Sequence, residues 1–117
     1  MELTINLESH ENYTLLMIEG DINTSTVHIL ENAIRNATTI NQNHIVLDCT
    51  LLKSINGDGL GLLLHCQVQL SEYYYFSLYN VSDEVASLME LSGITHFIQM
   101  NTQAENAKQQ HTEQQSA

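Results

Sequence analysis

The feature that most restricts the fold of this chain is a short apolar run at residues 44–49, HIVLDC, which a helical pattern follows closely. An apolar run of this length is typical of a strand covered on both faces, as in a sheet with crossover helices. Residues 61–70, GLLLHCQVQL, predict the crossover helix. Three glycines at alternate positions, Gly57, Gly59 and Gly61, crowd the connection. We therefore expect a glycine-rich loop at the carboxyl end of a central strand, where open α/β sheets place their sites.

Four further strands are predicted from extended-looking runs at residues 3–8, 13–19, 74–80 and 95–100. The first two form a predicted hairpin. Helical patterns separate the later strands, and this alternation predicts a mostly parallel sheet with right-handed crossovers. Residues 1–110 are expected to form one domain, which ends in a helical turn or two at residues 103–110. The polar residues 111–117 are expected to form a disordered tail.

Capping residues mark the first and third helices. Thr24 or Ser25 can cap the first helix, and Ser82 can cap the third. Gly93 is placed to end the third helix. Helical spacing assigns the inward-facing positions Val27, Leu30, Ile34 and Ala37 in the first helix and Val85, Leu88 and Met89 in the third. Both helices are therefore expected to pack an apolar stripe against the sheet.

Charge excludes two classes of partner. Three basic residues stand against 14 acidic ones, which makes the formal net charge −11. This charge repels nucleic acid and anionic membrane surfaces. No apolar run approaches the length of about 20 residues that a membrane span needs, and no signal-peptide pattern opens the chain. We expect a soluble, cytoplasmic protein. Cys49 and Cys66 lie in or beside apolar runs, which favours two buried thiols over a disulfide.

The glycine-rich segment matches no catalytic or cofactor motif. A P-loop needs a lysine after its last glycine, and a dinucleotide fingerprint needs its third glycine one residue beyond Gly61. A nucleophile elbow needs a serine where Asp58 lies. Residues 21–26, DINTST, begin like a calcium loop, but Thr26 occupies the position that requires glycine. The histidines show no metal-ligand spacing. We therefore predict no catalytic residue, no metal site and no cofactor.

A surface at the start of the second helix is the remaining candidate. Asn56 can cap this helix. Gly57 and Gly59 would let another molecule approach the backbone closely, and Asp58 would present a charge. Alternatively, the glycines only permit a tight turn beneath neighbouring elements. The residues alone leave both interpretations open.

Three segments, in the same order and with similar spacing, resemble the STAS domain, the fold of bacterial anti-sigma factor antagonists. They are GDIN at residues 20–23, HIVLDCTLLKSINGDGLGLLL at residues 44–64 and YNVSDEVASLMELSGITHFI at residues 79–98. The resemblance implies a mostly parallel sheet with an N-terminal hairpin and helices mainly on one face. It also implies a partner-switching regulator without catalysis of its own. Such a regulator binds a serine kinase of the histidine-kinase-like ATPase type, which is also the anti-sigma factor, and so frees the sigma factor.

In this family the kinase phosphorylates a serine at the start of the second helix, and the added charge separates the two proteins. The family motif D-S-S-G-L-G aligns with residues 56–61, so Gly57, which has no hydroxyl, stands at the usual acceptor position. The resemblance thus implies docking without the usual acceptor, and we expect a constitutive binder. Ser54 or Thr50 would be an unusual alternative acceptor. The implied partner-binding residues are Asn23, Thr24, Asn56, Gly57, Asp58 and Gly59.

The sequence also resembles proteins with a second role. In lipid-transport ABC systems a cytosolic STAS subunit packs against the ATPase subunit of the transporter. Residues 59–65, GLGLLLH, resemble the helix of that subgroup about as well. In either role we expect a monomer or a weak dimer.

Overall fold

The computed structural model describes residues 2–40, 44–70 and 72–107. They contain a five-stranded sheet whose strands lie in chain order. The first two strands pair antiparallel, and every later pair of neighbours is parallel. The predicted hairpin, element order and mostly parallel sheet are therefore confirmed. The strands are β1 Leu3–Ser9, β2 Thr14–Ile22, β3 His44–Ile55, β4 Tyr75–Val81 and β5 Gln99–Thr102.

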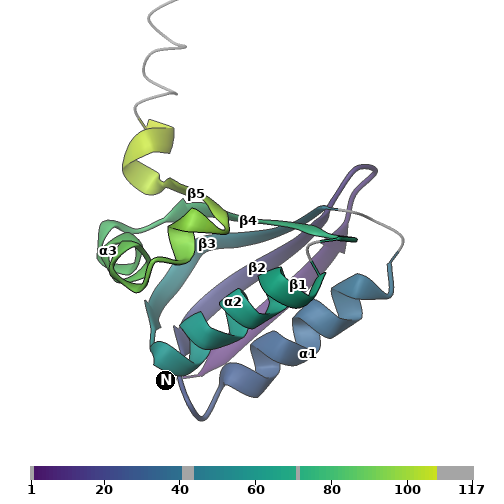
Figure 1. Ribbon diagram of the computed structural model, residues 1–117, viewed down its shortest axis with the longest axis horizontal. Helices are drawn as coiled ribbons and strands as arrows, with labels where there is room; N and C mark the ends of the chain where they lie inside the picture. The colour runs from purple at the N-terminus through teal and green to yellow at the C-terminus, as the bar shows by residue number, and fades with distance from the viewer. Residues whose placement is uncertain (1, 41–43, 71, 108–117) are drawn as a thin grey trace, which may run out of the picture.

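In the described chain, three α-helices and one 3-10 helix cover one face of this sheet, and a short helical segment at residues 103–107 follows the last strand. The covering helices are α1 Val27–Thr38, α2 Gly57–Leu70, α3 Asp83–Ser92 and the short 3-10 helix η1 Ile94–His96. Figure 1 shows α1 and α2 side by side across that face. Leu30 of α1, Leu63 of α2 and Met89 of α3 belong to one core together with the inner side chains of the sheet. The expectation that the helices pack mainly on one face is confirmed.

Burial alternates along the strands because successive side chains point to opposite faces of a sheet. On β3, Ile45, Leu47 and Cys49 are buried, whereas Val46 and Asp48 between them are only partly buried. We call the other side the uncovered face. Its side chains, on and just before β2 and on β3 to β5, include Tyr13, Leu15, Met17, His44, Val46, Asp48, Ser77, Tyr79, Gln99 and Asn101.

The expectation that residues 44–49 form a strand covered on both faces is therefore wrong for the described chain. The strand order supplies the reason. From β2 to β5, each new strand is added on the same side of the previous one. Right-handed crossovers that always advance in one direction place every crossover helix on the same face.

The helix α2 begins earlier than the sequence suggested. Its first turns contain all three glycines of the segment, Gly57, Gly59 and Gly61, which therefore do not form a loop. The Asn56 Oδ1 accepts hydrogen bonds from the backbone N–H groups of Asp58 at 3.1 Å and Gly59 at 3.2 Å. The predicted cap is thus confirmed. A Cβ on Gly59 would lie 2.5 Å from the Ile22 Cγ2, so the packing of α2 on the sheet requires glycine there.

The predicted caps of the other two helices differ in outcome. The prediction of Thr24 or Ser25 for α1 is wrong, because the N-cap is Thr26 and it makes no side-chain cap hydrogen bond. At α3, the Ser82 Oγ accepts a hydrogen bond from the backbone N–H of Val85, as predicted. Gly93 ends α3 with a φ of 81°, in the left-handed region that favours glycine.

Two further expectations for the C-terminal part need correction. The last strand was expected at residues 95–100, but the chain first forms η1 and then β5. The Phe97 N–H donates to the Ile94 carbonyl at 2.9 Å, which closes the 3-10 turn before the strand begins. Leu88 was expected in the inner stripe of α3 and is 43% exposed, since Ala86 takes the inner position beside Val85.

The remaining expectations for the chain concern its cysteines and its C-terminus. Cys49 and Cys66 are free and buried, as predicted. Residues 103–107 are helical, which confirms the predicted helical turn as far as residue 107. Residues 108–110 and the tail predicted at 111–117 lie outside the described residues, and the boundary of the domain stays a prediction. None of the described helices combines the length and the apolar character that crossing a membrane would require.

Candidate functional site

The candidate site lies at the carboxyl ends of β2 and β3, where the first turns of α1 and α2 begin (Figure 1). The backbone N–H of Asn56 donates to the carbonyl of Ile22 at 3.0 Å, which fixes the two connections beside each other. The carboxyl ends of parallel strands are the usual place for a binding site in an open α/β sheet. The predicted site residues 23–24 and 56–59 therefore come from two connections that meet.

Three of these residues contact one another. The Thr24 Oγ1 donates to the Asp58 Oδ2 at 2.5 Å, and the Asn56 Nδ2 donates to the Thr24 Oγ1 at 3.4 Å. Thr24 and Asp58 are exposed and Asn56 is half-buried. The Asp58 carboxylate lies in the first turn of α2, where it interacts favourably with the helix dipole by about 0.3–1 kcal/mol.

Asn23 and Gly59 help to position the backbone that carries these side chains. The Asn23 Oδ1 accepts hydrogen bonds from the backbone N–H groups of Ser25 at 2.9 Å and Thr26 at 3.2 Å, so its side chain orders the turn before α1. Gly59 is buried, and its neighbours are the side chains of Ile22 and Ile55. Asn23 thus orders one connection, and Gly59 lets α2 pack closely on the ends of β2 and β3.

Gly57 lies on the exposed side of the same helix turn. A Cβ built at this position meets nothing within 4 Å. The position that resembles the acceptor of the family is therefore at the surface, with open space around a Cβ placed there.

The two alternative acceptors are hydrogen-bonded to carboxylates. The Ser54 Oγ donates to the Asp21 Oδ1 at 2.6 Å. The Thr50 Oγ1 donates to the Asp48 Oδ1 at 2.6 Å and accepts from the Asn80 Nδ2 at 2.8 Å. A phosphate on either hydroxyl would lie against a carboxylate. Sequence reasoning missed the Asp21–Ser54 contact because the two residues are 33 positions apart and meet only through the register of β2 and β3.

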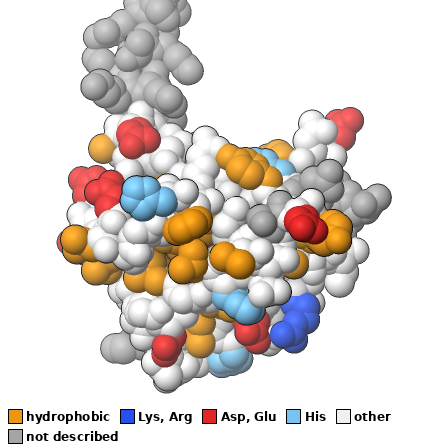
Figure 2. Space-filling view, viewed as in Figure 1, with side chains coloured by type: hydrophobic (Ala, Val, Ile, Leu, Met, Phe, Trp, Pro, Cys, Tyr) orange, Lys and Arg blue, Asp and Glu red, His pale blue; other side chains and the backbone are white. Residues whose placement is uncertain are grey.

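Acidic residues outnumber basic ones in this sequence, by 14 to three. On the face shown in Figure 2, the blue of Lys and Arg lies over α1, which carries Arg35, whereas red Asp and Glu side chains are spread more widely. Among the described residues, no group of three His, Cys, Asp or Glu side chains is placed to hold a metal ion. The site offers hydroxyl, amide and carboxylate groups for hydrogen bonds, which suits docking of a protein surface.

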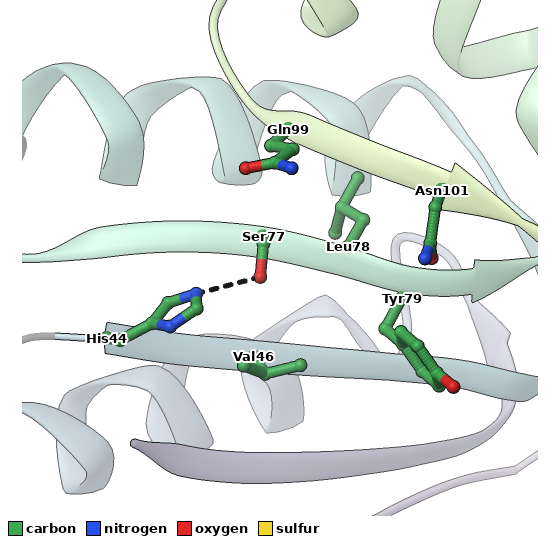
Figure 3. A pocket seen from close by; sticks show the side chains of 7 residues that line it. All are labelled: His44, Val46, Ser77, Leu78, Tyr79, Gln99 and Asn101. Atoms are coloured by element: carbon green, nitrogen blue, oxygen red, sulfur yellow. Dashed lines mark hydrogen bonds between the residues drawn. The ribbon is translucent and has the colours of Figure 1, made fainter. Parts of the chain in front are cut away.

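A serine–histidine pair that sequence reasoning missed lies elsewhere, on the uncovered face. The His44 Nε2 is 2.9 Å from the Ser77 Oγ (Figure 3). Burial lowers the pKa of His44 below its usual value. Within the described parts of the chain, no carboxylate hydrogen-bonds to the His44 ring, so the pair lacks the third group that orients a catalytic base. His44, Val46 and Asp48 are spaced two residues apart along one strand. The alternation of side chains in a strand could therefore have predicted that they lie on the same face of the sheet.

Comparisons with known proteins agree with this architecture. No curated protein matches the sequence. Among solved structures, an anti-sigma factor antagonist from Mycobacterium paratuberculosis matches with a TM-score of 0.77 at 19% identity, over 85% of each chain. The antagonist SpoIIAA matches in its unphosphorylated form with a TM-score of 0.69 at 19% identity, over 93% of this chain and 97% of that chain. Phosphorylated SpoIIAA from Bacillus matches with a TM-score of 0.62 at 18% identity, over 91% and 98%.

At these identities the structural likeness shows the fold, and the sequence match shows the family. A family model described as "Mlab, STAS domain" matches residues 5–100. This range runs from within β1 to the start of β5 and contains α1, α2, α3 and both connections of the candidate site. The chain therefore belongs to the STAS domain family.

Proposed function

We propose that this STAS domain is a non-catalytic partner-switching regulator, which binds a serine-kinase anti-sigma factor and so releases a sigma factor. The solved structures of similar fold that support this role are described as anti-sigma factor antagonists. The observation that carries the proposal is the exposed start of α2, where Gly57 and Asp58 lie beside Thr24. The protein acts in the cytoplasm, as a monomer or a weak dimer.

We further propose that binding is constitutive, because Gly57 has no hydroxyl to phosphorylate. Asp58 is a poor mimic of the missing phosphate. It carries one charge, whereas a phosphoserine carries about 1.5 to 2. Successive helical residues point about 100° apart, so Asp58 projects in another direction than a group at position 57. Its carboxylate is also hydrogen-bonded to Thr24.

The test replaces the glycine at the acceptor position. Gly57→Ser should gain a phosphate when incubated with ATP and the histidine-kinase-like serine kinase of the same organism, and the phosphorylated protein should leave the kinase. Gly61→Ser is the matched control, because it adds a hydroxyl one turn further along α2, also at an exposed position without neighbours within 4 Å. Mass spectrometry of the wild type and both variants locates the phosphate.

Phosphate on wild-type Ser54 or Thr50 would mean that the switch has moved to another residue. A Gly57→Ser variant that stays unmodified and does not bind the kinase would overturn the anti-sigma role. Asp58→Ser tests the direction of the switch through the dissociation constant of the kinase complex. We expect little change, and a tenfold tighter complex, about 1.4 kcal/mol, would show that Asp58 holds the partner off.

A second candidate is favoured by the description of the matching family model, "Mlab, STAS domain". In this alternative the same surface packs against the ATPase subunit of a lipid-transport ABC transporter. Binding of the purified ATPase subunit, weakened by Gly57→Arg but not by Gly61→Arg, would support the transporter role. In that case the serine kinase should bind neither the wild-type protein nor the two variants.

A further inference from the structure

The uncovered face carries a continuous set of hollows. The largest has a volume of about 430 Å³ and is lined by Tyr13, Leu15, His44, Val46, Asp48 and Tyr79. A second, of about 270 Å³, shares His44, Val46 and Tyr79 with the first and continues to Gln99 and Asn101 on β5. A third, of about 300 Å³, shares Asp48 with the first and extends toward β1. The hollows together cross the sheet from one edge to the other.

The side chains in these hollows combine apolar surface with a few polar groups. Figure 3 shows His44 and Ser77 pointing toward one another from neighbouring strands, close to Val46. The Tyr79 side chain is 43% exposed, and Leu15 and Val46 are half-buried. Parallel sheets are usually covered on both faces, because their strands bury apolar side chains on both. The aliphatic and aromatic side chains of this face offer apolar surface to a further element, beside the polar side chains of His44, Asp48, Ser77, Gln99 and Asn101.

The charges on this face indicate the kind of surface that can pack against it. Of the described residues that line the three hollows, Asp48 and Glu19 are acidic and none is Lys or Arg. Burial disfavours the charged form of His44. A complementary surface therefore carries Lys or Arg beside apolar side chains. A second copy of this chain would bring acid against acid, at a formal net charge of −11 on each copy.

The C-terminal residues of this sequence do not have the required composition. Residues 108–117, KQQHTEQQSA, contain no Leu, Ile, Val, Met, Phe, Tyr or Trp. A strand from a partner would pair with the edge of a sheet, since the backbone groups within the sheet are already paired. A helix packs on the face of a sheet and places one apolar stripe against it.

We propose that the uncovered face is a docking surface for an amphipathic helix of a partner protein. The apolar stripe of that helix enters the hollows around Val46 and Tyr79. Lys or Arg side chains on its margins pair with Asp48 and Glu19. This contact lies on the opposite side of the sheet from α2 and does not depend on the role proposed for Gly57.

The probe is a designed helical peptide of about 18 residues, roughly 27 Å long, with leucines along one face and lysines on the other. A peptide with glutamate in place of lysine is its control. We expect the lysine peptide to shift the backbone amide signals of Leu15, Val46 and Tyr79 in NMR spectra of the whole protein. The glutamate peptide should leave these signals unchanged.

Substitutions of two tyrosines distinguish docking on the uncovered face from general attraction between opposite charges. Tyr79→Ser should weaken binding of the lysine peptide about tenfold. Tyr73→Ser is the matched control, because Tyr73 is 68% exposed, lines none of the hollows, and its replacement leaves the net charge unchanged. Asp48→Asn should weaken binding and reduce its salt dependence. Both substitutions on the uncovered face are at partly exposed positions, and thermal unfolding checks that each variant is folded.

Three outcomes would overturn the proposal. The first is equal loss of binding, or no loss, in Tyr79→Ser and Tyr73→Ser. The second is a set of NMR shifts confined to α3, where Leu91 is 86% exposed and hydrophobic side chains also gather (Figure 2). The third is a wild-type dimer in sedimentation experiments that Tyr79→Ser dissociates, because the occupant would then be a second copy.

Discussion

The two faces of the sheet share one backbone and have opposite surroundings. On β3, Leu47 is 1% exposed beneath the helices, while its neighbour Val46 faces the open hollows. Both side chains are aliphatic, so the residue type does not decide which of them is buried. The direction of the crossovers decides it, because each one leads to the same side of the sheet. The comparison teaches that one face forms the core of the fold, whereas the other leaves its side chains partly exposed in hollows.

The largest difference is expected between two neighbouring alanine substitutions on β3. Leu47→Ala should lower the free energy of unfolding by about 2–5 kcal/mol, because it leaves a cavity in the core. Val46→Ala should cost about 1 kcal/mol or less, since its side chain is only half-buried. Urea denaturation followed by circular dichroism measures both. Similar losses in the two variants would break the distinction between the faces.

The same comparison can be made along α2, between a glycine against the covered face and one toward solvent. Gly59→Ala should cost about 1–3 kcal/mol, because the added Cβ would lie 2.5 Å from Ile22 and 2.7 Å from Ile55 side-chain atoms. Gly61→Ala should stabilise the protein by about 0.5–1 kcal/mol, since it removes a helix-interior glycine without a clash. Thermal unfolding of the two variants should show melting temperatures that move in opposite directions.

A smaller effect is expected at the cap that joins the site to the core. Asn56→Ala should cost about 1 kcal/mol, because the first turn of α2 loses the acceptor for two backbone N–H groups. Asn56→Asp is the control, since an aspartate can accept the same hydrogen bonds. Chemical denaturation of the three proteins gives the comparison. Equal destabilisation by both substitutions would show that the amide nitrogen, which donates to Thr24, matters more than the cap.

The smallest effect on the free energy of unfolding is expected from the thiol of Cys49, on the covered face, at alkaline pH. Burial raises the pKa of Cys49 from its ordinary value of 9.0 to about 12. Because the folded state keeps the proton longer than the unfolded state, this contribution is complete below pH 9 and is lost as the pH rises toward 12. At pH 9.5 the loss should be below about 1 kcal/mol. Cys49→Ala should flatten the fall in stability between about pH 8 and 9.5, and an unchanged slope would contradict the raised pKa.

Local patterns predicted the elements and their order. The apolar run at residues 44–49 indicated the central strand, and Asn56 and Ser82 were identified as caps from their position before a helical pattern. Gly93 was correctly expected to end α3. These features depend on contacts within a few residues along the chain, which is why the sequence carries them. The same patterns did not predict the 3-10 turn at Ile94–His96, which lies where the last strand was expected to begin.

The candidate site was predicted as a set of positions, without the contacts that organise it. The alignment with the family motif placed Gly57 and Asp58 at the start of α2. The hydrogen bond from Thr24 to Asp58 and the one from Ser54 to Asp21 were not predicted. Each joins residues more than 30 positions apart, and no local pattern encodes such a pair. The site therefore needed the register between β2 and β3 before its chemistry could be described.

The sequence by itself determined the alternation of strands and helices, the acidic character and the family, because these follow from residue types and their spacing. Tertiary structure alone decided that the strands lie in chain order and that α1, α2 and α3 cover one face. It also decided that Gly59 is required by Ile22, whereas a Cβ at Gly57 would meet no neighbour. The physical reason is that a parallel strand can be added on either side of its predecessor with the same local pattern. Only the packing of distant segments selects the side, and with it which face of the sheet remains uncovered.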